Sequence, residues 1–225
     1  MFEKQGPLSE TLKQQVYQII KDQICQGIYN PGEWLQEKEL ANKFKISRSP
    51  VREALRQLAS DGLVEVVPHK GVFVKEVTAK DIEDIFDIRM LLESYAIEKA
   101  PKKLDDEKIL LLQNCVDSLV TTHREDNLAL YIEYDTILHN MLIDISGNEI
   151  LKTTYERIHY MIMPFRVYSL TTKERFDESV IEHKGIIENI FNGNIQESKR
   201  LMKIHLELAK EKLQEYIIGL AGNQG

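Results

Sequence analysis

The sequence has little of several features, and each scarcity excludes a class of protein. Its 225 residues include two cysteines, Cys25 and Cys115, which lie far apart and form no CxxC pair. We therefore expect reduced thiols and exclude a cysteine-rich zinc site. No apolar run approaches the roughly 18–20 residues that span a bilayer, and the N-terminal segment MFEKQGPLSE lacks the apolar core of a signal peptide. We expect a cytoplasmic protein with no membrane partner.

Basic residues are also in the minority, which at first argues against a nucleic-acid partner. The chain has 29 Lys and Arg against 36 Asp and Glu, a formal net charge of −7. The imbalance is uneven, because residues 1–75 hold 11 basic and 9 acidic residues whereas the remaining 150 hold 18 and 27. DNA binding needs positive charge on one surface rather than over the whole chain. The distribution permits a DNA-binding N-terminal part without requiring one.

The N-terminal third has the pattern of helices followed by a β-hairpin. Apolar stripes predict three helices, over about 9–26, 37–44 and 47–61. Ser9 is a plausible N-cap of the first helix. Two β-rich runs, 63–67 and 72–74, flank a turn that contains Pro68 and Gly71, which predicts a hairpin. This order of elements is that of a winged helix-turn-helix, which we place in residues 1–76.

From Thr78 onward the strand signals stop and helical stripes recur. They predict helices over about 78–100, 105–123, 127–145, 149–169, 173–191 and 195–220. Pro164 lies inside the fourth of these and is expected to kink or split it. The predicted fold class is therefore mainly α: a winged helix-turn-helix with a small β-hairpin wing, followed by an all-α helical bundle in residues 77–225.

The third predicted helix begins with polar and basic side chains that lie opposite its apolar stripe. They are Ser47, Arg48, Ser49 and Arg52. A recognition helix presents such side chains from its N-terminal turn while its other face packs. Arginine can hydrogen-bond bidentately to guanine, and serine can hold a phosphate. The spacing alone fits a solvated helix face with two ordinary arginines equally well.

Residues 10–75 resemble the N-terminal domain of the GntR family of bacterial regulators. The resemblance rests on five segments in order: GIYNPG at 27–32, EKELA at 37–41, SRSPVREAL at 47–55, LASDGLV at 58–64 and GVFV at 71–74. It implies that a double-stranded DNA operator is contacted by Lys38, Ser47, Arg48, Ser49, Arg52, His69, Lys70 and Gly71. Gln36 is a departure, because the family usually has a Ser or Thr helix cap there.

The wing tip also suits DNA on physical grounds. Lys70 supplies a charge for a phosphate, and Gly71 would let the backbone approach the minor groove closely. His69 could donate a hydrogen bond there, but it also fits a plain exposed turn residue. One recognition helix contacts only a few base pairs, so we expect a homodimer that reads two half-sites.

Ligand-capable residues lie on the apolar stripes of three helices in the second half of the chain. Asp135 and His139 share a face at i,i+4 spacing, and His183 and His205 lie among apolar residues of two later helices. A buried carboxylate or imidazole is costly unless it is paired or bound to a metal. One Asp and three His suit Zn²⁺, Ni²⁺, Mn²⁺ or Fe²⁺. The alternative is that each histidine is a separately satisfied core residue.

Residues 80–215 resemble the FadR C-terminal ligand-binding domain, the FCD domain. The markers are IRMLLE at 88–93, DTILH at 135–139, SGN at 146–148, EH at 182–183, GN at 193–194 and His205. In the metal-binding type of this domain, the residues matching Asp135, His139, His183 and His205 bind a divalent metal ion. The resemblance further implies a small organic-acid effector at that metal.

Three other residues of the bundle have more than one interpretation. Arg89 could hold the effector's carboxylate, or it could form a helix salt bridge with Glu93 at i+4. His123 lies at a helix end, where a histidine often caps carbonyl groups, and His159 lies beside an apolar stripe. We expect both histidines to be structural.

Together the patterns predict a DNA-binding transcription regulator, not an enzyme, whose operator affinity is controlled by a small organic acid at a metal site. One alternative is a regulator for which the metal itself is the signal. Another is a metal-dependent hydrolase fused to a DNA-binding domain, since a His/Asp site with open positions can activate water. Against the hydrolase, the sequence has no placed general base such as the glutamate of HExxH.

Overall fold

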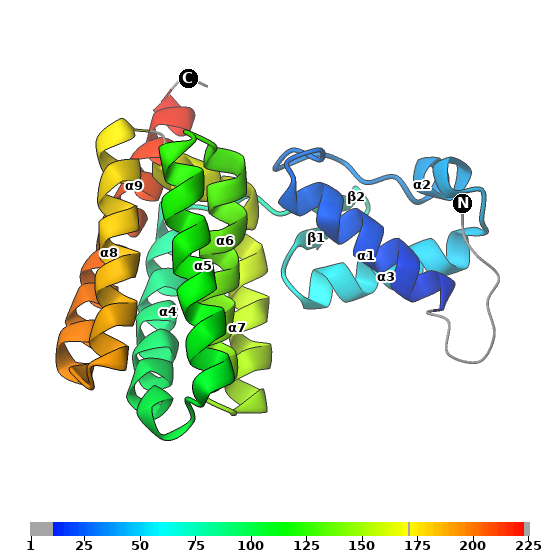
Figure 1. Cartoon of the computed structure of the whole chain (residues 1–225). Coiled ribbons are helices and arrows are strands. Elements are labelled where there is room, and N and C mark those ends of the chain that lie inside the picture. The colour runs from blue at the N-terminus through cyan, green and yellow to red at the C-terminus, as the bar shows by residue number, and fades with distance from the viewer. Residues whose placement is uncertain (1–10, 171, 223–225) are drawn as a thin grey trace. The chain divides into compact units, whose positions relative to one another are not determined.

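The computed structural model describes residues 11–170 and 172–222, and the chain divides into two compact units between Val77 and Thr78. Figure 1 shows the smaller N-terminal unit and the helical C-terminal unit. The mainly α fold class predicted from the sequence, with one small hairpin, is confirmed. Each unit has its own buried apolar residues and is described by itself.

The N-terminal unit contains helices α1, α2 and α3 and strands β1 and β2. Their bounds are Leu12–Cys25, Glu37–Phe44, Arg48–Ser60, Val64–Val67 and Gly71–Val74. The cap of α1 is Thr11, which forms a reciprocal capping box with Gln14. The plausible cap Ser9 lies outside the described residues. Gln36 makes no side-chain cap bond to α2, as its departure from the family pattern suggests.

The core of this unit forms where the apolar faces of its helices meet. Val16 and Ile20 of α1 and Val51, Leu55 and Leu58 of α3 are all essentially unexposed. The stripe on α3 leaves its opposite face free, because that face carries the polar residues of the helix start. Packing of α1 on α3 thus fixes which side of α3 points to solvent.

The wing is the antiparallel pair β1 and β2, with Val64 opposite Val74. Trp34 pairs with Phe73 beside it, and the two rings stack with centroids 6.4 Å apart. Gly71 has φ of +130°, and a Cβ there would lie 2.4 Å from Nε1 of Trp34. The fold itself therefore requires glycine at position 71, whatever the wing contacts.

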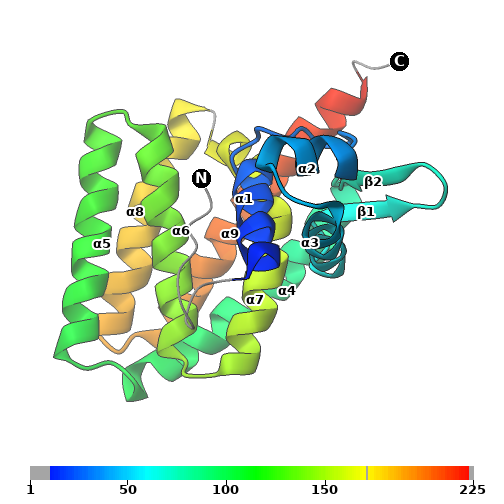
Figure 2. The ribbon, with the colours of Figure 1, turned by 90° about the vertical axis from the view of Figure 1, so that its right-hand side faces the viewer.

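The C-terminal unit is a bundle in which neighbouring helices run side by side (Figures 1 and 2). Its elements are α4 (Ala79–Lys99), η1 (Ala100–Lys102), α5 (Asp106–Arg124), α6 (Leu128–Ile145), α7 (Glu149–Ile162), η2 (Met163–Leu170), α8 (Lys173–Phe191) and α9 (Ile195–Gly222). Helix α7 ends two residues before Pro164, and the 3₁₀ helix η2 continues from there. The proline thus coincides with a split in the segment predicted as one helix.

Side chains at the helix starts define where the bundle elements begin. The N-cap residues Thr78, Asp105, Asn127, Asn148 and Thr172 each accept a hydrogen bond from a backbone N–H of the first turn. A cap of this kind contributes about 1 kcal/mol. Within the described residues, none of these helices combines the length and apolar character needed to cross a membrane.

His159 of α7 is a buried polar group within this core. Its ring stacks on Tyr155 at a centroid distance of 5.5 Å, and 2% of the residue is exposed. Among the described residues, neither ring nitrogen has a hydrogen-bond partner. Burial, together with the charges of Arg166 and Arg89, lowers the pKa of His159 well below its ordinary value.

His123, at the end of α5, pairs with a side chain and not with a carbonyl group as its position in the sequence suggests. Its Nε2 lies 2.7 Å from Oδ1 of Asp177.

We predict that His159→Phe stabilises the metal-free protein more at acidic than at neutral pH. The folded chain keeps His159 neutral, whereas the unfolded chain protonates it below about pH 6.5, so wild-type stability falls below that pH. The advantage of the variant grows by about 1.4 kcal/mol for each pH unit below about 6.5. Urea denaturation at about pH 7.5 and about pH 5.5 measures it.

Tyr155→Phe is the matched control, because it removes a buried hydroxyl whose burial, together with the charge of Glu93, raises the pKa of the phenol. Its effect on the free energy of unfolding is the same at both pH values. An equal effect of His159→Phe at both pH values contradicts the prediction.

Candidate functional site

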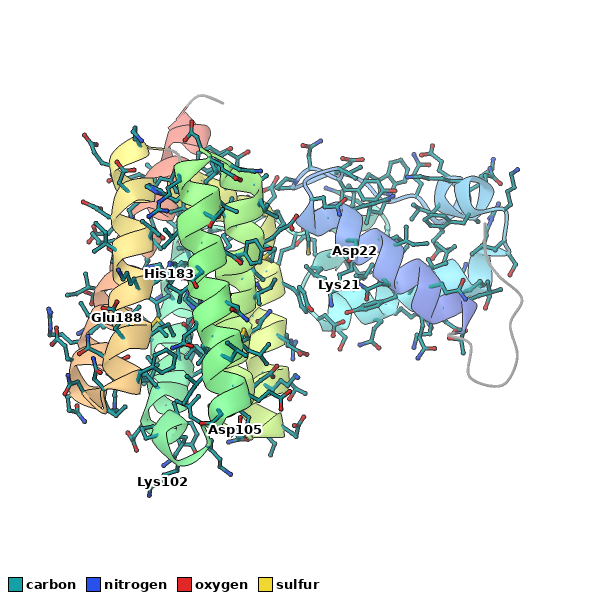
Figure 3. All side chains as sticks on the ribbon, in the orientation of Figure 1. Lys21, Asp22, Lys102, Asp105, His183 and Glu188 are labelled. Atoms are coloured by element: carbon teal, nitrogen blue, oxygen red, sulfur yellow. The ribbon has the colours of Figure 1, made fainter. Side chains whose placement is uncertain are left out.

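Four buried residues from three helices converge inside the bundle. Asp135 and His139 come from α6, His183 from α8 and His205 from α9. Each offers one ligand atom, and these atoms all lie within 4.8 Å of one another. No more than 4% of any of the four residues is exposed, and Figure 3 labels His183 on α8. The structure thus brings together the four residues that the sequence singles out as metal ligands.

His183 contacts the other members of the cluster most closely. Its Nε2 lies 3.0 Å from Oδ1 of Asp135 and 3.4 Å from Nε2 of His139. Nε2 of His139 is 3.8 Å from the same Asp135 oxygen. The ring of His205 lies 4.3 Å from that of His183, measured between centroids. Donor atoms of two helices therefore point at one small region, and the third helix supplies a ring beside it.

Outer carboxylates occupy the other nitrogen of two of these imidazoles. Nδ1 of His139 lies 2.6 Å from Oε2 of Glu93, and Nδ1 of His205 lies 2.7 Å from Oε2 of Glu182. A carboxylate accepts from Nδ1–H, which leaves the lone pair of a neutral imidazole on Nε2. The Nε2 lone pairs of both rings are therefore available to a metal ion.

For His183, the partner at Nδ1 is supplied by the hydroxyls of Tyr131 and Ser179 instead of a carboxylate. The Tyr131 hydroxyl donates to Oγ of Ser179 at 2.9 Å, so an oxygen lone pair remains for Nδ1 of His183 at 3.2 Å. Nδ1–H of His183 can then donate to that oxygen. All three histidines thus have a partner at Nδ1.

Three arginines pair with the carboxylates of this region. Arg89 donates through Nε to Oε1 of Glu93 at 2.9 Å, Arg175 bonds both oxygens of Glu182 at 3.1 and 2.6 Å, and Arg166 donates to Oδ2 of Asp135. Asp135 therefore uses one oxygen for Arg166 and keeps the other toward the histidines. Arg166 also donates to the Thr136 hydroxyl, which fixes its direction.

The arginine contacts keep the carboxylates ionised, and burial keeps His139 and His205 neutral. Burial raises the pKa of Glu182, but the His205 and Arg175 contacts outweigh it and bring the pKa to about 2. The pKa of Asp135 likewise lies well below its ordinary value, because the charge of Arg166 outweighs the burial of the carboxylate. Burial lowers the pKa of His205 to about 3, and burial also lowers that of His139. Metal coordination requires these protonation states.

A small cavity adjoins the cluster. Its walls include Asp135 and His205 of the cluster, the three arginines Arg89, Arg166 and Arg175, and apolar residues such as Phe86 and Leu213. It holds about 20 Å³, which is room for about one water. Among the described residues, Nη2 of Arg89 and Nε of Arg175 have no hydrogen-bond partner.

The predicted DNA-contacting residues lie mostly on exposed parts of the N-terminal unit. Lys38, Ser47, Arg48, Ser49, Arg52, His69 and Lys70 are exposed, and Gly71 is half-buried. Ser47 occupies the N-cap position of α3 but makes no side-chain cap bond, so its hydroxyl is not committed to the helix. Arg52 donates to both oxygens of Glu37 on α2, at 2.9–3.1 Å. Arg52 therefore has a partner within the protein.

The sequence interpretation missed most of the outer partners. The sequence patterns do not single out Tyr131, Arg166 or Arg175. A signal existed for Arg175, which lies seven residues before Glu182 and therefore on the same face of the predicted helix. Arg166 had none, because η2 is a 3₁₀ helix whose residues do not follow a 3.6-residue period.

The chain matches two family models that together cover most of its length. Residues 12–74 match the bacterial regulatory proteins of the gntR family, and residues 84–208 match the FCD domain. YdhC of Bacillus subtilis (strain 168), an uncharacterized HTH-type transcriptional regulator, is 30% identical over 204 residues, or 90% of this chain and 91% of that protein.

Solved structures share the fold. A GntR transcriptional regulator from Rhodococcus sp. RHA1 has a TM-score of 0.77 and 21% identity, covering 89% of this chain and 96% of that one. The metal-free FCD domain of TM0439 has a TM-score of 0.56 and 24% identity, covering 64% of this chain and 99% of that one. The chain therefore belongs to the GntR family of bacterial regulatory proteins, as a DNA-binding transcription regulator that carries an FCD domain.

Proposed function

We propose that this regulator binds its operator as a homodimer and that a small organic acid, held at a divalent metal in the helical unit, controls that binding. The cluster of Asp135, His139, His183 and His205 is the observation that carries the proposal. Its histidines each have an outer partner at Nδ1, an arrangement that separately buried core histidines do not need.

The exposed start of α3 supports DNA reading by Arg48. Arg48 is exposed, and the exposed residues Ser47 and Ser49 lie beside it in sequence at the helix N-terminus. A helix N-terminus attracts phosphate, while arginine can reach a guanine edge. In this proposal Arg48 contacts a base edge, and Arg52 leaves its ion pair with Glu37 to contact the DNA.

A face of α4 supports dimerisation. Leu91 is 67% exposed, and Ile88 and Tyr95 are exposed beside it. The residues around Leu91 and Tyr95 border a groove of about 770 Å³ between α4 and α9. A two-fold pair of chains would cover such apolar side chains and would match two half-sites in the operator.

Arg48→Ala should weaken binding to an operator selected from random duplex DNA by about 1–3 kcal/mol and relax the preference at one base pair of each half-site. Fluorescence anisotropy measures the affinity. Arg124→Ala, the same change at the exposed end of α5, is the control and leaves affinity unchanged. Full affinity of the Arg48 variant would show that this residue does not read DNA.

Sedimentation of the wild-type protein with operator DNA tests the dimer. One 26.1 kDa chain bound per operator would exclude it.

The donor set of the cluster fits a divalent metal ion. Zinc, nickel, manganese and iron accept imidazole nitrogen and carboxylate oxygen. Bonds of about 2.0–2.2 Å place two donors at most about 4.4 Å apart, so the 4.8 Å spread of the cluster closes with small side-chain movements. A bound ion supplies positively charged positions for the oxygens of a ligand. Tyr131, Glu93 and Glu182 hold the imidazoles in the orientation that such an ion needs.

Tyr131→Phe should lower the affinity for zinc by about 10-fold, because Nδ1 of His183 loses the nearer of its two hydroxyl partners and keeps only Oγ of Ser179 at 3.4 Å. Competition with a chelator measures the affinity, and elemental analysis gives the metal content. Tyr134→Phe makes the same atomic change on the same helix, three residues away, and leaves the affinity at the wild-type value. His183→Ala retains almost no metal. A wild-type protein that takes up no divalent metal during supplemented purification rules out the metal centre.

Arg89 supports the effector part of the proposal. It forms the predicted i,i+4 ion pair with Glu93, yet its Nη2 has no partner among the described residues and the residue lines the cavity. A guanidinium can bond a second carboxylate through its remaining N–H groups. Arg89 can therefore hold the effector while it remains paired with Glu93.

We predict that at least one small carboxylate changes the operator affinity of the zinc-loaded wild type by about 5-fold to 150-fold, and that it has no effect on His183→Ala. Without carboxylate, the variant binds the operator as the wild type does, because the DNA-reading residues belong to the other unit. Anisotropy titrations measure both. A carboxylate response that survives in His183→Ala contradicts the proposal. A switch driven by zinc alone would identify the metal as the signal.

A further inference from the structure

The wing carries the sole tryptophan of the chain on a short third strand. The backbone around Trp34 runs antiparallel to β2 (Figure 2), and the N–H of Leu35 donates to the carbonyl of Val72 at 2.8 Å. Leu35 is buried in the core of the N-terminal unit, whereas Trp34 is 50% exposed. Because successive side chains of a strand point to opposite faces, Trp34 lies on the outer face of the wing.

The indole of Trp34 reaches the tip of the wing. Its ring stacks on Phe73, and its Nε1 lies 2.4 Å from the point that a Cβ of residue 71 would occupy. Gly71 directly follows Lys70, an exposed residue of the turn. The indole nitrogen therefore lies against the backbone of the segment that is predicted to contact DNA.

Trp34 also leads into the second predicted DNA-contacting segment of this unit. Three positions after it, Glu37 begins α2, and the next residue is the exposed Lys38. The backbone of Trp34 is thus continuous with the start of α2, while its side chain covers Gly71. One residue therefore connects the predicted DNA contacts of α2 with those of the wing.

Charge on the wing indicates the side from which a phosphate can approach. Phe73 lies between Glu65 of β1 and Trp34, because it pairs with both. The exposed carboxylate of Glu65 repels a phosphate on the β1 side. On the other side of Phe73, the neutral indole presents an N–H group. A DNA strand that passes the outer face of the wing is therefore favoured on the Trp34 side.

The indole N–H has an unused capacity to donate a hydrogen bond. An indole is a donor only, and among the described residues Nε1 of Trp34 donates to no acceptor. Phosphate oxygens accept hydrogen bonds from neutral side chains in protein–DNA interfaces, and such contacts position a protein without reading sequence. The proposed function places the tip of the wing against the duplex, so the DNA backbone comes within reach of this N–H.

We propose that Nε1–H of Trp34 donates to a phosphate oxygen of the DNA strand that borders the groove entered by the wing. This inference rests on the proposed DNA-binding mode and adds a residue outside the contacts that the family resemblance implies. The contact is neutral and independent of sequence. Trp34 is therefore a positioning residue, which holds the wing on any duplex while α3 reads the bases.

Trp34→Phe keeps a ring beside Phe73 and removes the N–H. It should weaken binding to a selected operator and to a random duplex by the same factor, about 3-fold to 10-fold. Because no charge is lost, the slope of log affinity against log salt stays at the wild-type value, whereas Lys70→Ala reduces it by about one. Fluorescence anisotropy with labelled duplexes measures both quantities.

Tyr29→Phe is the control for this variant. It removes a polar atom from an aromatic side chain of the same unit, at Lys43 near the end of α2, and leaves the affinity unchanged. Thermal melts verify that both variants are folded.

Intrinsic fluorescence provides a second test on the unmodified protein. Because Trp34 is the sole tryptophan, selectively excited tryptophan emission reports on this residue alone. Saturation with either duplex should lower the acrylamide quenching constant at least about twofold, since the DNA backbone then covers the indole. An unchanged quenching constant overturns the inference.

Operator duplexes with one neutral methylphosphonate linkage at a time locate the contact. At one linkage in each half-site, the replacement should weaken the wild type about 3-fold to 10-fold more than it weakens Trp34→Phe, because both changes remove the same hydrogen bond. Equal losses in the two proteins at every linkage overturn the phosphate contact. An effect of Trp34→Phe on the operator alone shows base reading and also overturns it.

The outcomes distinguish this inference from the proposed function. Wild-type affinity of Trp34→Phe for both duplexes overturns the inference and leaves operator binding through Arg48 standing. A wild-type protein that binds neither duplex overturns both.

Discussion

The Glu93 carboxylate, with no exposure to solvent, holds Arg89 on one oxygen and His139 on the other. It thereby connects α4 to α6 through charged hydrogen bonds in the centre of the bundle. Removing such a group would leave an arginine without a partner in an apolar interior, at a cost of about 3–5 kcal/mol. The orientation of His139, and with it one side of the histidine cluster, depends on this single carboxylate.

The same construction recurs on the other side of the cluster. Glu182 lies between Arg175 and His205 as Glu93 lies between Arg89 and His139. In both cases an arginine keeps a carboxylate ionised, and the carboxylate fixes which nitrogen of a histidine faces inward. The buried ion pairs favour one arrangement of the helices, because a shift of a helix would separate an arginine from the carboxylate that compensates its charge. The proposed effector site depends on such an arrangement in order to bind one shape of ligand.

The sequence predicts the fold well wherever periodicity and caps agree. Helices α2 and α8 have the bounds that their apolar stripes indicate, and Asn127 and Thr78 mark helix starts by their capping chemistry. The four clustered residues were also recognisable, because a charged or polar residue on an apolar stripe stands out. What the sequence could not reveal is pairing between elements. Arg166 follows a proline in an irregular segment, and its contact with Asp135 depends on how η2 packs.

Local interactions explain two smaller differences in the N-terminal unit. Thr11 caps α1 through a reciprocal bond with Gln14, which the apolar stripe alone did not indicate. Gly71 was predicted for its closeness to DNA, but the indole of Trp34 already requires it. Trp34 lies 37 positions earlier in the chain, and no local pattern connects the two residues.

The ion pair between Arg52 and Glu37 has a consequence for how the protein searches DNA. Each arginine that neutralises a phosphate releases counterions from the duplex, and this release supplies most of the attraction to random sequence. Because Glu37 already neutralises Arg52, this residue adds little to that attraction until a well-placed acceptor displaces the carboxylate. Random DNA seldom offers such an acceptor at the right position. In the proposed DNA-binding mode, an acidic residue beside α3 therefore shortens the time that the protein spends on random DNA and makes operator binding more selective.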